Sequence, residues 1–240
     1  MAELTADAER PSGAPAAVRS RVRVDNFSIS LDGYAAGPRQ SHADPLGAGG
    51  QQLHEWLFAA RDRRTQPGWS AVTAGPDDRF AQAGEEGLGA TIMGRNMFGP
   101  VRGRWPAEPW NGWWGENPPF HHPVFVLTHF ARPPVQLAGG TTYHFVPDGI
   151  QAALRRAREA AGERDIRIGG GVQTVRQYLD AGLIDELHLV LVPVLLGGGE
   201  RLFAAPEPGS GPPGYECVEL VGSDSVVHLR LRRTAGSPPA

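Results

Sequence analysis

The sequence predicts one α/β domain with a mostly parallel sheet and an antiparallel C-terminal edge. Segments typical of strands alternate with segments of helical periodicity over most of the 240 residues. The last two strand-like segments, 215–221 and 226–232, have no helix between them, which favours an antiparallel pair. The 40% apolar content is sufficient for one sizeable core, and we find no linker that divides the chain.

The first half of the chain is expected to hold two strands and two helices, separated by two long loops. Polar and apolar residues alternate from Arg21 onwards, and apolar residues recur on one face of the segment after Gly50. We expect strands over 21–30 and 90–93, helices over 51–63 and 77–87, and loops over 37–50 and 99–123. The second loop contains four tryptophans, and a loop this long inside a domain is usually functional.

The second half is expected to alternate strands and helices more regularly. Asp148 is a candidate N-cap of one helix, and Gly182 follows the end of another. We expect strands over 124–128, 142–146, 165–168 and 185–196, and helices over 149–161 and 172–181. Residues 1–20 and 234–240 are expected to be disordered tails, so the predicted domain covers 21–233.

Composition excludes several functional classes. A net charge of −3 and a pI of about 6.2 do not favour nucleic acid or an anionic membrane as a partner. The single cysteine, Cys217, cannot form an internal disulfide, and no cysteine cluster predicts a metal site. The chain has no transmembrane run and no secretory signal, so we expect a cytoplasmic protein.

The strongest local signal for a ligand is the glycine turn Gly169–Gly171, which stands between an expected strand and an expected helix beginning at Val172. Glycines allow a phosphate to approach the unpaired N–H groups of a helix N-terminus. The alternative is a tight turn without a ligand. Thr174 occupies the last glycine position of a dinucleotide fingerprint, and no phosphate-loop lysine follows, so neither common motif is present.

Two more expected strands end in residues that suit a phosphate. The first is followed by Gly94, Arg95 and Asn96, where the arginine offers a planar pair of donors. The second ends at Thr128 and His129, with Arg132 close behind. Either segment could instead be an ordinary polar turn.

Six segments in order resemble the dihydrofolate reductase-like superfamily, and within it the RibD C-terminal domain of riboflavin-biosynthesis deaminase-reductases and their stand-alone bacterial relatives. They span roughly residues 22–232. The segments are Ser30-Leu31-Asp32-Gly33-Tyr34, Met93-Gly94-Arg95, 123–128, Ile168-Gly169-Gly170-Gly171, Leu183-Ile184-Asp185-Glu186-Leu187 and Pro193-Val194-Leu195-Leu196-Gly197-Gly198-Gly199.

The resemblance implies a mixed sheet with helices on both faces, a homodimer, and NADPH bound across the carboxyl ends of the strands. The cationic side chains near two of the turns would favour NADPH over NADH, because the additional phosphate is a dianion near neutral pH. The residues that would bind the cofactor are Gly94, Arg95, Asn96, Thr128, His129, Arg132, Gly169, Gly170, Gly171, Val172 and Thr174.

The substrate end is less specific. Asp32 and His54 are candidate proton donors, with water as the alternative, although Asp32 could be a turn residue and His54 a surface residue. Ser30, Trp56, Trp113 and Leu196 are the candidate substrate contacts. The tryptophan loop could instead fill a core or a dimer seam.

We therefore predict an NADPH-dependent reductase that transfers a hydride to a C=N or C=O carbon of a small heterocyclic or aromatic substrate, similar to a pterin or pyrimidine. The resemblance also disfavours folate, since dihydrofolate reductases hold the pterin with a carboxylate on the first helix, and here no acid lies one turn before the aromatic segment at Trp56. The alternatives are a flavin- or deazaflavin-linked reductase and an inactive ligand-binding or resistance module.

Overall fold

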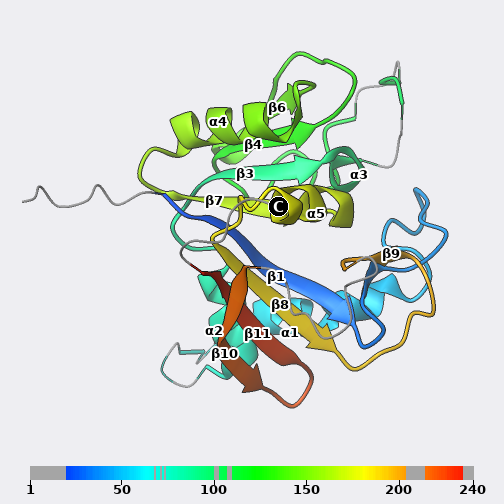
Figure 1. Ribbon diagram of the computed structural model, residues 1–240, viewed down its shortest axis with the longest axis vertical. Helices are drawn as coiled ribbons and strands as arrows, with labels where there is room; N and C mark the ends of the chain where they lie inside the picture. Colours follow the sequence, from blue (N-terminus) through cyan, green and yellow to red (C-terminus); the bar gives the residue numbers. More distant parts are fainter. Residues whose placement is uncertain are drawn as a thin grey trace, which may run out of the picture.

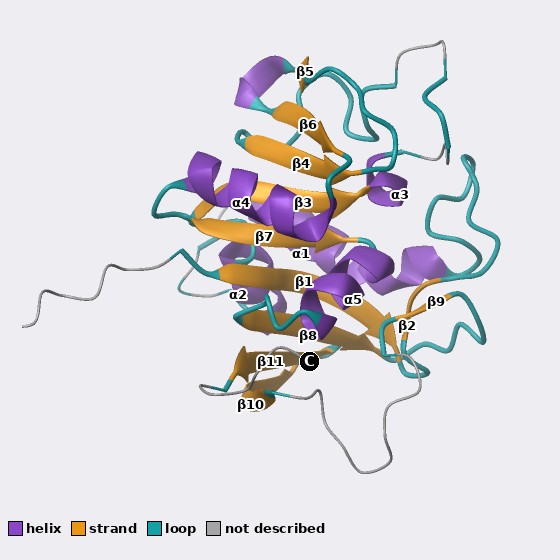
Figure 2. Cartoon of the chain, turned by 45° about the horizontal axis from the view of Figure 1, so that its top comes forward, coloured by secondary structure: helices purple, strands orange, loops and turns teal. Residues whose placement is uncertain are grey.

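The computed structural model describes residues 20–67, 69–70, 72, 74–99, 103–106, 110–203 and 214–234. Almost all of the two predicted tails lies outside these residues. In the described part of the chain, one sheet contains nine strands in the order β10-β11-β8-β1-β7-β3-β4-β6-β5, and a second pairs β2 with β9 (Figures 1 and 2).

The strands of the larger sheet and the two short strands have the following bounds. They are β1 (Val22–Ser30), β2 (Tyr34–Ala36), β3 (Leu88–Gly94), β4 (Pro123–Leu127), β5 (Val135–Gln136), β6 (Thr142–Val146), β7 (Asp165–Gly170), β8 (Glu186–Val192), β9 (Glu200–Arg201), β10 (Tyr215–Gly222) and β11 (Val227–Arg233). The helices are η1 (Gly50–His54), α1 (Glu55–Arg64), α2 (Pro76–Ala83), α3 (Arg95–Phe98), η2 (Ala138–Gly140), α4 (Gly149–Ala161) and α5 (Val172–Asp180).

The pairing of the strands confirms the predicted fold class. Strands β8, β1, β7, β3, β4 and β6 run parallel to one another, whereas β11 is antiparallel to β8, β10 to β11 and β5 to β6. β7 lies between β1 and β3 although it follows both in the chain. All six parallel strands therefore end at the same edge, where their connecting turns come together.

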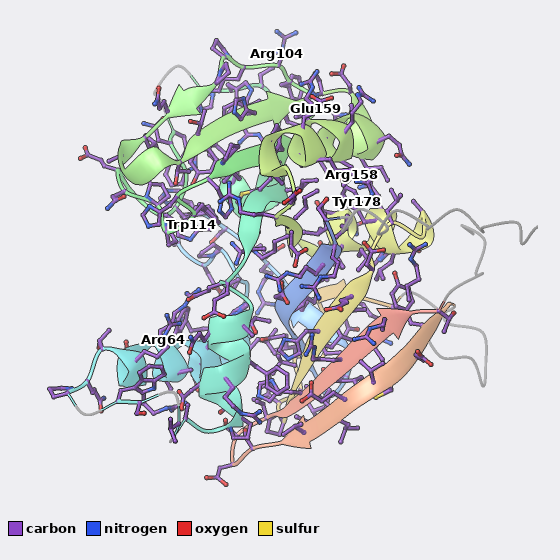
Figure 3. The ribbon with its side chains drawn as sticks, turned by 90° about the vertical axis from the view of Figure 1, so that its left-hand side faces the viewer. Arg64, Arg104, Trp114, Arg158, Glu159 and Tyr178 are labelled. Atoms are coloured by element: carbon purple, nitrogen blue, oxygen red, sulfur yellow. The ribbon has the colours of Figure 1, made fainter. Side chains whose placement is uncertain are left out.

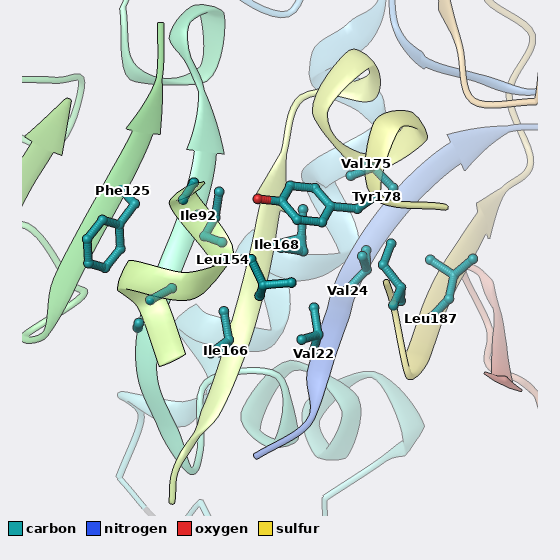
Figure 4. Packing of buried hydrophobic residues seen from close by; sticks show 14 of the residues in the cluster. Val22, Val24, Ile92, Phe125, Leu154, Ile166, Ile168, Val175, Tyr178 and Leu187 are labelled. Atoms are coloured by element: carbon teal, nitrogen blue, oxygen red, sulfur yellow. The ribbon is translucent and has the colours of Figure 1, made fainter. Parts of the chain in front are cut away.

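Helices cover both faces of the sheet. Helices α4 and α5 pack on one face through Leu154, Val175 and Tyr178, against Ile166 and Ile168 of β7 (Figure 4). Helices α1 and α2 lie on the opposite face (Figure 2). Figure 3 shows that Trp114 of the tryptophan loop lies on that face too.

The structure differs from the predicted elements mainly at their ends. The first helix begins with the 3-10 turn η1, and α2 ends at Ala83 rather than at residue 87. β8 ends at Val192, so residues 193–196 form a loop instead of the end of a long strand. Asp148 does occupy the N-cap position of α4, but its side chain makes no capping hydrogen bond and pairs with Arg156 instead.

A buried chain of polar side chains fastens α2 to the sheet. The backbone N–H of Asn26 donates to Nδ1 of His188 at 3.2 Å. This leaves the proton of the neutral His188 ring on Nε2, which donates to Nδ1 of His228 at 3.1 Å. Nε2 of His228 then donates to Asp77 at 2.8 Å, and the hydroxyl of Ser225 donates to the other oxygen of Asp77 at 2.8 Å.

Aromatic rings surround these two histidines. Phe80 of α2 stacks on both rings, with centroid distances of 4.6 Å to His188 and 4.2 Å to His228. The edge of Trp56 contacts His228 from α1. A hydrogen-bonded chain with apolar cover on its sides is stable only while every member is paired.

Candidate functional site

The polar turns predicted from the sequence lie next to one another at the carboxyl edge of the sheet. Along this edge β4 ends at Leu127, directly before Thr128, β3 ends at Gly94 and β7 at Gly170, and β1 then ends at Ser30 beside β8. Ligands of open α/β sheets bind outside the carboxyl ends of the strands. The edge is therefore the candidate site.

The glycine turn lies in the middle of this edge. Gly171 is the N-cap of α5, and a Cβ atom at this position would meet no atom of the described residues within 4 Å, its two chain neighbours aside. At the N-terminus of α5 that begins here, the first N–H groups have no acceptor within the helix. The bond between Gly170 and Gly171 is a cis peptide.

Gly94 packs directly against this turn. A Cβ atom on Gly94 would overlap the hydroxyl of Thr174 and lie 3.6 Å from both Gly170 O and Gly171 N. The side chains of Thr174 and Val172 are buried, so these two residues can offer only backbone groups to a ligand. The structure thus brings together two turns that are about 75 residues apart in the sequence.

Arg95 and Arg132 meet on the ring of Trp105. The Arg95 guanidinium lies 3.2 Å from the ring centroid and that of Arg132 lies 5.1 Å from it. Arg132 donates to the backbone oxygen of Trp110 at 2.6 Å. Nε and Nη2 of Arg95 are buried and have no hydrogen-bond partner among the described residues.

This arrangement leaves positive charge without an opposite charge. Within the described part of the chain, neither Arg95 nor Arg132 forms an ion pair with a carboxylate. Burial and the neighbouring Arg132 lower the pKa of Arg95 to about 10, so the guanidinium is still charged at neutral pH. A phosphate placed here would supply the missing acceptors.

The other predicted cofactor residues contribute less. The hydroxyl of Thr128 is buried and bonds to Phe130 in its own turn. Asn96 and His129 are exposed at the edge.

Ser30 and Asp32 form a compact turn at the end of β1. The Ser30 hydroxyl donates to Asp32 at 2.5 Å, and the carboxylate also accepts N–H bonds from Leu196 and Gly197 at 3.1 and 2.7 Å. The hydrogen bond from Ser30, aided by those from the two backbone amides, lowers the pKa of Asp32 to about 2. Asp32 is ionised at neutral pH, which argues against its predicted role as a proton donor.

The geometry also argues against two other predicted residues. Burial, with Arg61 nearby, lowers the pKa of His54 to about 4, so it carries almost no proton to donate at neutral pH. Trp56 is only 4% exposed, and its Nε1 donates to Ser28 in the core. Its assignment as a substrate contact is corrected: the apolar face of α1 turns Trp56 into the sheet.

Trp113 and Leu196 are in suitable places for contacts with a substrate. Trp113 is half-buried and contacts Trp110 and His42, with ring centroids 4.8 and 5.6 Å apart. His42 comes from the 37–50 loop, so the two long loops meet at this edge. Leu196 lies on the loop after β8 and packs against Gly49.

Sequence reasoning missed four residues of this region. Trp105 holds the two arginines, His42 joins the two loops, and Met97 and Phe27 lie next to Gly170. Only Trp105 had a signal in the sequence, since it belongs to the tryptophan-rich loop.

The described residues contain no group of three or more His, Cys, Asp or Glu side chains arranged to hold a metal ion. None of the described helices combines the length and the apolar character needed to cross a membrane.

The fold and this edge define an α/β domain with its polar turns gathered where such sheets bind ligands. Comparison with known families agrees with the resemblance described above. The RibD C-terminal domain model matches residues 24–229. The chain therefore belongs to the RibD C-terminal domain family.

Solved structures show the same fold. A protein of Shewanella sp. PV-4 assigned to riboflavin biosynthesis is 22% identical, with a TM-score of 0.52 over 90% of this chain and 99% of that one. The diaminohydroxyphosphoribosylaminopyrimidine deaminase/5-amino-6-(5-phosphoribosylamino)uracil reductase of Thermotoga maritima is 16% identical, and RibD of Acinetobacter baumannii is 20% identical. Both have a TM-score of 0.52 over 90% of this chain, which spans 57% and 59% of their lengths.

A curated relative is similar over a shorter stretch. The uncharacterized protein YyaP of Bacillus subtilis (strain 168) is 34% identical over 59 residues. This stretch is 25% of the present chain and 31% of that protein.

Proposed function

We propose that this protein is an NADPH-dependent reductase that acts on a C=N or C=O group of a small, pyrimidine-like heterocycle. The observation that carries the proposal is the pair of arginines on Trp105, where two buried nitrogens of Arg95, Nε and Nη2, have no acceptor among the described residues. Family membership and the reductases among the proteins of similar fold support it.

The order of the strands suggests how the cofactor would lie. Arg95 and Arg132 flank the end of β3 and β4 and would bind the 2′-phosphate. The pyrophosphate would face the open space at Gly171, one strand further along the edge. An extended dinucleotide would then reach Ser30 and the loop after β8, about two strand spacings or about 10 Å beyond β3.

When bound, NADPH would supply the hydride. The protein would orient the cofactor and the substrate and would keep water away from the reacting atoms. Trp113, from the tryptophan loop, and Leu196, from the loop after β8, would both contact the substrate. Since Asp32 is ionised and His54 is neutral, we propose water as the source of the proton.

The direct test is to titrate the protein with NADPH and NADH while following nicotinamide fluorescence, and then to measure NADPH oxidation with pyrimidine, pterin, quinone and imine substrates. We expect micromolar NADPH binding, weaker NADH binding and turnover with a heterocycle. The proposal fails if NADPH does not bind at high micromolar concentrations. A purified protein that is yellow would instead support the flavin alternative.

Gly171→Ala provides a test of the glycine turn. The added methyl group would enter open space, so we expect an unchanged melting temperature and NADPH binding that is weaker by about three- to tenfold, because the phosphate can no longer approach as closely. Calorimetric titration and thermal unfolding measure the two effects. Unchanged affinity in a folded variant would remove the turn from the cofactor site.

Gly170 is less suitable for the same test. Its φ of 127° lies in the region that side chains rarely adopt, so Gly170→Val would strain the backbone as well as the site. The homodimer and the cytoplasmic location stay predictions.

A further inference from the structure

Asp32 connects two segments that are far apart in the sequence. One carboxylate oxygen accepts from the Ser30 hydroxyl and from the backbone of Leu196, and the other accepts from the backbone of Gly197. The backbone N–H of Leu31 also donates to Val194 O at 2.9 Å. The turn after β1 is thus tied to the loop after β8.

The loop after β8 is shaped to receive this carboxylate. Leu196 and Gly197 present consecutive N–H groups, an arrangement that forms a small anion-binding concavity. Gly197 has a φ of 69°, a left-handed conformation that favours glycine. Gly199 has a φ of 117°, and a Cβ atom there would overlap Ala36 O, so the loop is also held close to β2.

The tied loop places apolar side chains at the substrate end of the edge. Leu195, in the loop after β8, is 73% exposed, and Leu31, in the turn after β1, is 55% exposed. Leu196 is half-buried and packs against the buried cluster that contains Leu53, Trp56 and Leu57. Without the bonds to Asp32, the loop would keep the Leu31–Val194 backbone bond and the apolar packing of Val194 and Leu196, but neither of these binds the amides of Leu196 and Gly197.

We propose that Asp32 is a positioning residue, which fastens the loop 193–199 to the end of β1 and so sets the apolar wall beside the substrate. The part of this inference that concerns turnover rests on the proposed function. The hydrogen bonds that hold Leu196 and Gly197 to Asp32 are observed independently of that function. In this role the carboxylate transfers no proton and contacts neither reacting atom, but it fixes where Leu195 and Leu196 meet the substrate.

The test compares Asp32→Asn and Asp32→Ala with the unchanged protein. Hydrogen exchange of the Leu196 and Gly197 amides is measured first, without any ligand. We expect exchange to be about tenfold faster in Asp32→Ala, because both amides lose their acceptor, and to rise less in Asp32→Asn, whose amide oxygen still accepts. Unchanged exchange in Asp32→Ala would overturn the proposal.

Steady-state kinetics then separate positioning from proton transfer. We expect Asp32→Ala to raise the KM for the substrate about fivefold or more, with NADPH affinity changed less than about twofold. Asp32→Asn should recover most of the loss, and the pH profile of kcat between pH 5 and 8 should keep its shape. An equal collapse of kcat in both variants would assign proton transfer to Asp32 and overturn the proposal.

Asp44→Ala is the matched control, since Asp44 is an exposed acid in the neighbouring loop. We expect it to change neither the exchange of the two amides nor the kinetics. If the protein oxidises no NADPH at all, the proposed function fails, whereas the exchange of Leu196 and Gly197 still decides whether Asp32 holds the loop.

Discussion

Arg95→Ala is expected to weaken NADPH binding by about 1–3 kcal/mol, or roughly 5- to 150-fold, while NADH binding changes much less. The proposed partner of Arg95 is the 2′-phosphate, which NADH lacks. Loss of packing on Trp105 would affect both cofactors, so the ratio of the two affinities isolates the charged hydrogen bond. Calorimetric titration of both cofactors gives this ratio.

Arg104→Ala is the control for this measurement. Arg104 lies in the same loop region as Trp105 but is exposed, and its replacement should leave both affinities unchanged. Arg132→Ala should lower the NADPH preference in the same direction as Arg95→Ala. If Arg95→Ala reduces NADPH and NADH binding equally, Arg95 does not read the 2′-phosphate and the main support of the proposed function is lost.

Asp77→Ala is expected to lower the free energy of unfolding by about 2–4 kcal/mol, because it removes the acceptor at the end of a buried hydrogen-bonded chain. His228 is fully buried and would keep an unpaired N–H group, and Ser225 would lose its acceptor as well. Urea unfolding at pH 7.5 measures the change. Asp62→Ala, an exposed acid on α1, is the control and should have little effect.

The buried hydrogen bonds through His188, His228 and Asp77 also predict that the free energy of unfolding falls in acid. Burial, with His228 and Arg230 nearby, lowers the pKa of His188 to about 3 from its ordinary 6.5. Between these values the unfolded chain binds a proton that the folded protein excludes, so stability is lost as the pH falls, by about 1.4 kcal/mol per pH unit at most. Burial opposes ionisation of Asp77, but hydrogen bonds from His228 and neighbouring serines still hold its pKa below its ordinary value, which adds a loss at lower pH.

His188→Gln tests this cause. The variant should be less stable at pH 7.5 and should lose less stability than the unchanged protein between pH 6.5 and pH 4. His129→Gln, at an exposed position, serves as the control. A steep acid dependence that is identical in all three proteins would assign it to other groups.

Much of the fold could be predicted because its signals are local. The bounds of β6 and α4 agree with the prediction, since both segments have clear periodicity and end at turn residues. The end of β8 could not be predicted. Residues 193–196 are as apolar as the strand before them, but Pro193 has no N–H for a strand ladder, and Val194 and Leu196 bond to Leu31 and Asp32 instead.

The candidate site, too, has some features that local sequence predicts and others that depend on contacts between distant segments. Glycines and polar residues after strands were visible in the sequence at Gly94, Thr128 and Gly169–Gly171. Their convergence depends on the position of β7 between β1 and β3, which is a property of the sheet and not of any one segment. The roles of single side chains were still less predictable: Trp56 is in the core because of the direction in which α1 presents it.

By itself, the sequence determined where most of the longer strands and helices lie, that the sheet is mostly parallel, and which turns suit a phosphate, whereas the short elements β2, β5, β9 and α3 were not predicted. These properties depend on residues within a few positions of one another. Only the tertiary structure decided that Arg95 and Arg132 share Trp105, that Asp32 binds amides about 165 residues away, and that His228 reaches Asp77 across 151 positions. Such contacts depend on strand order and register, because these set which distant side chains lie side by side.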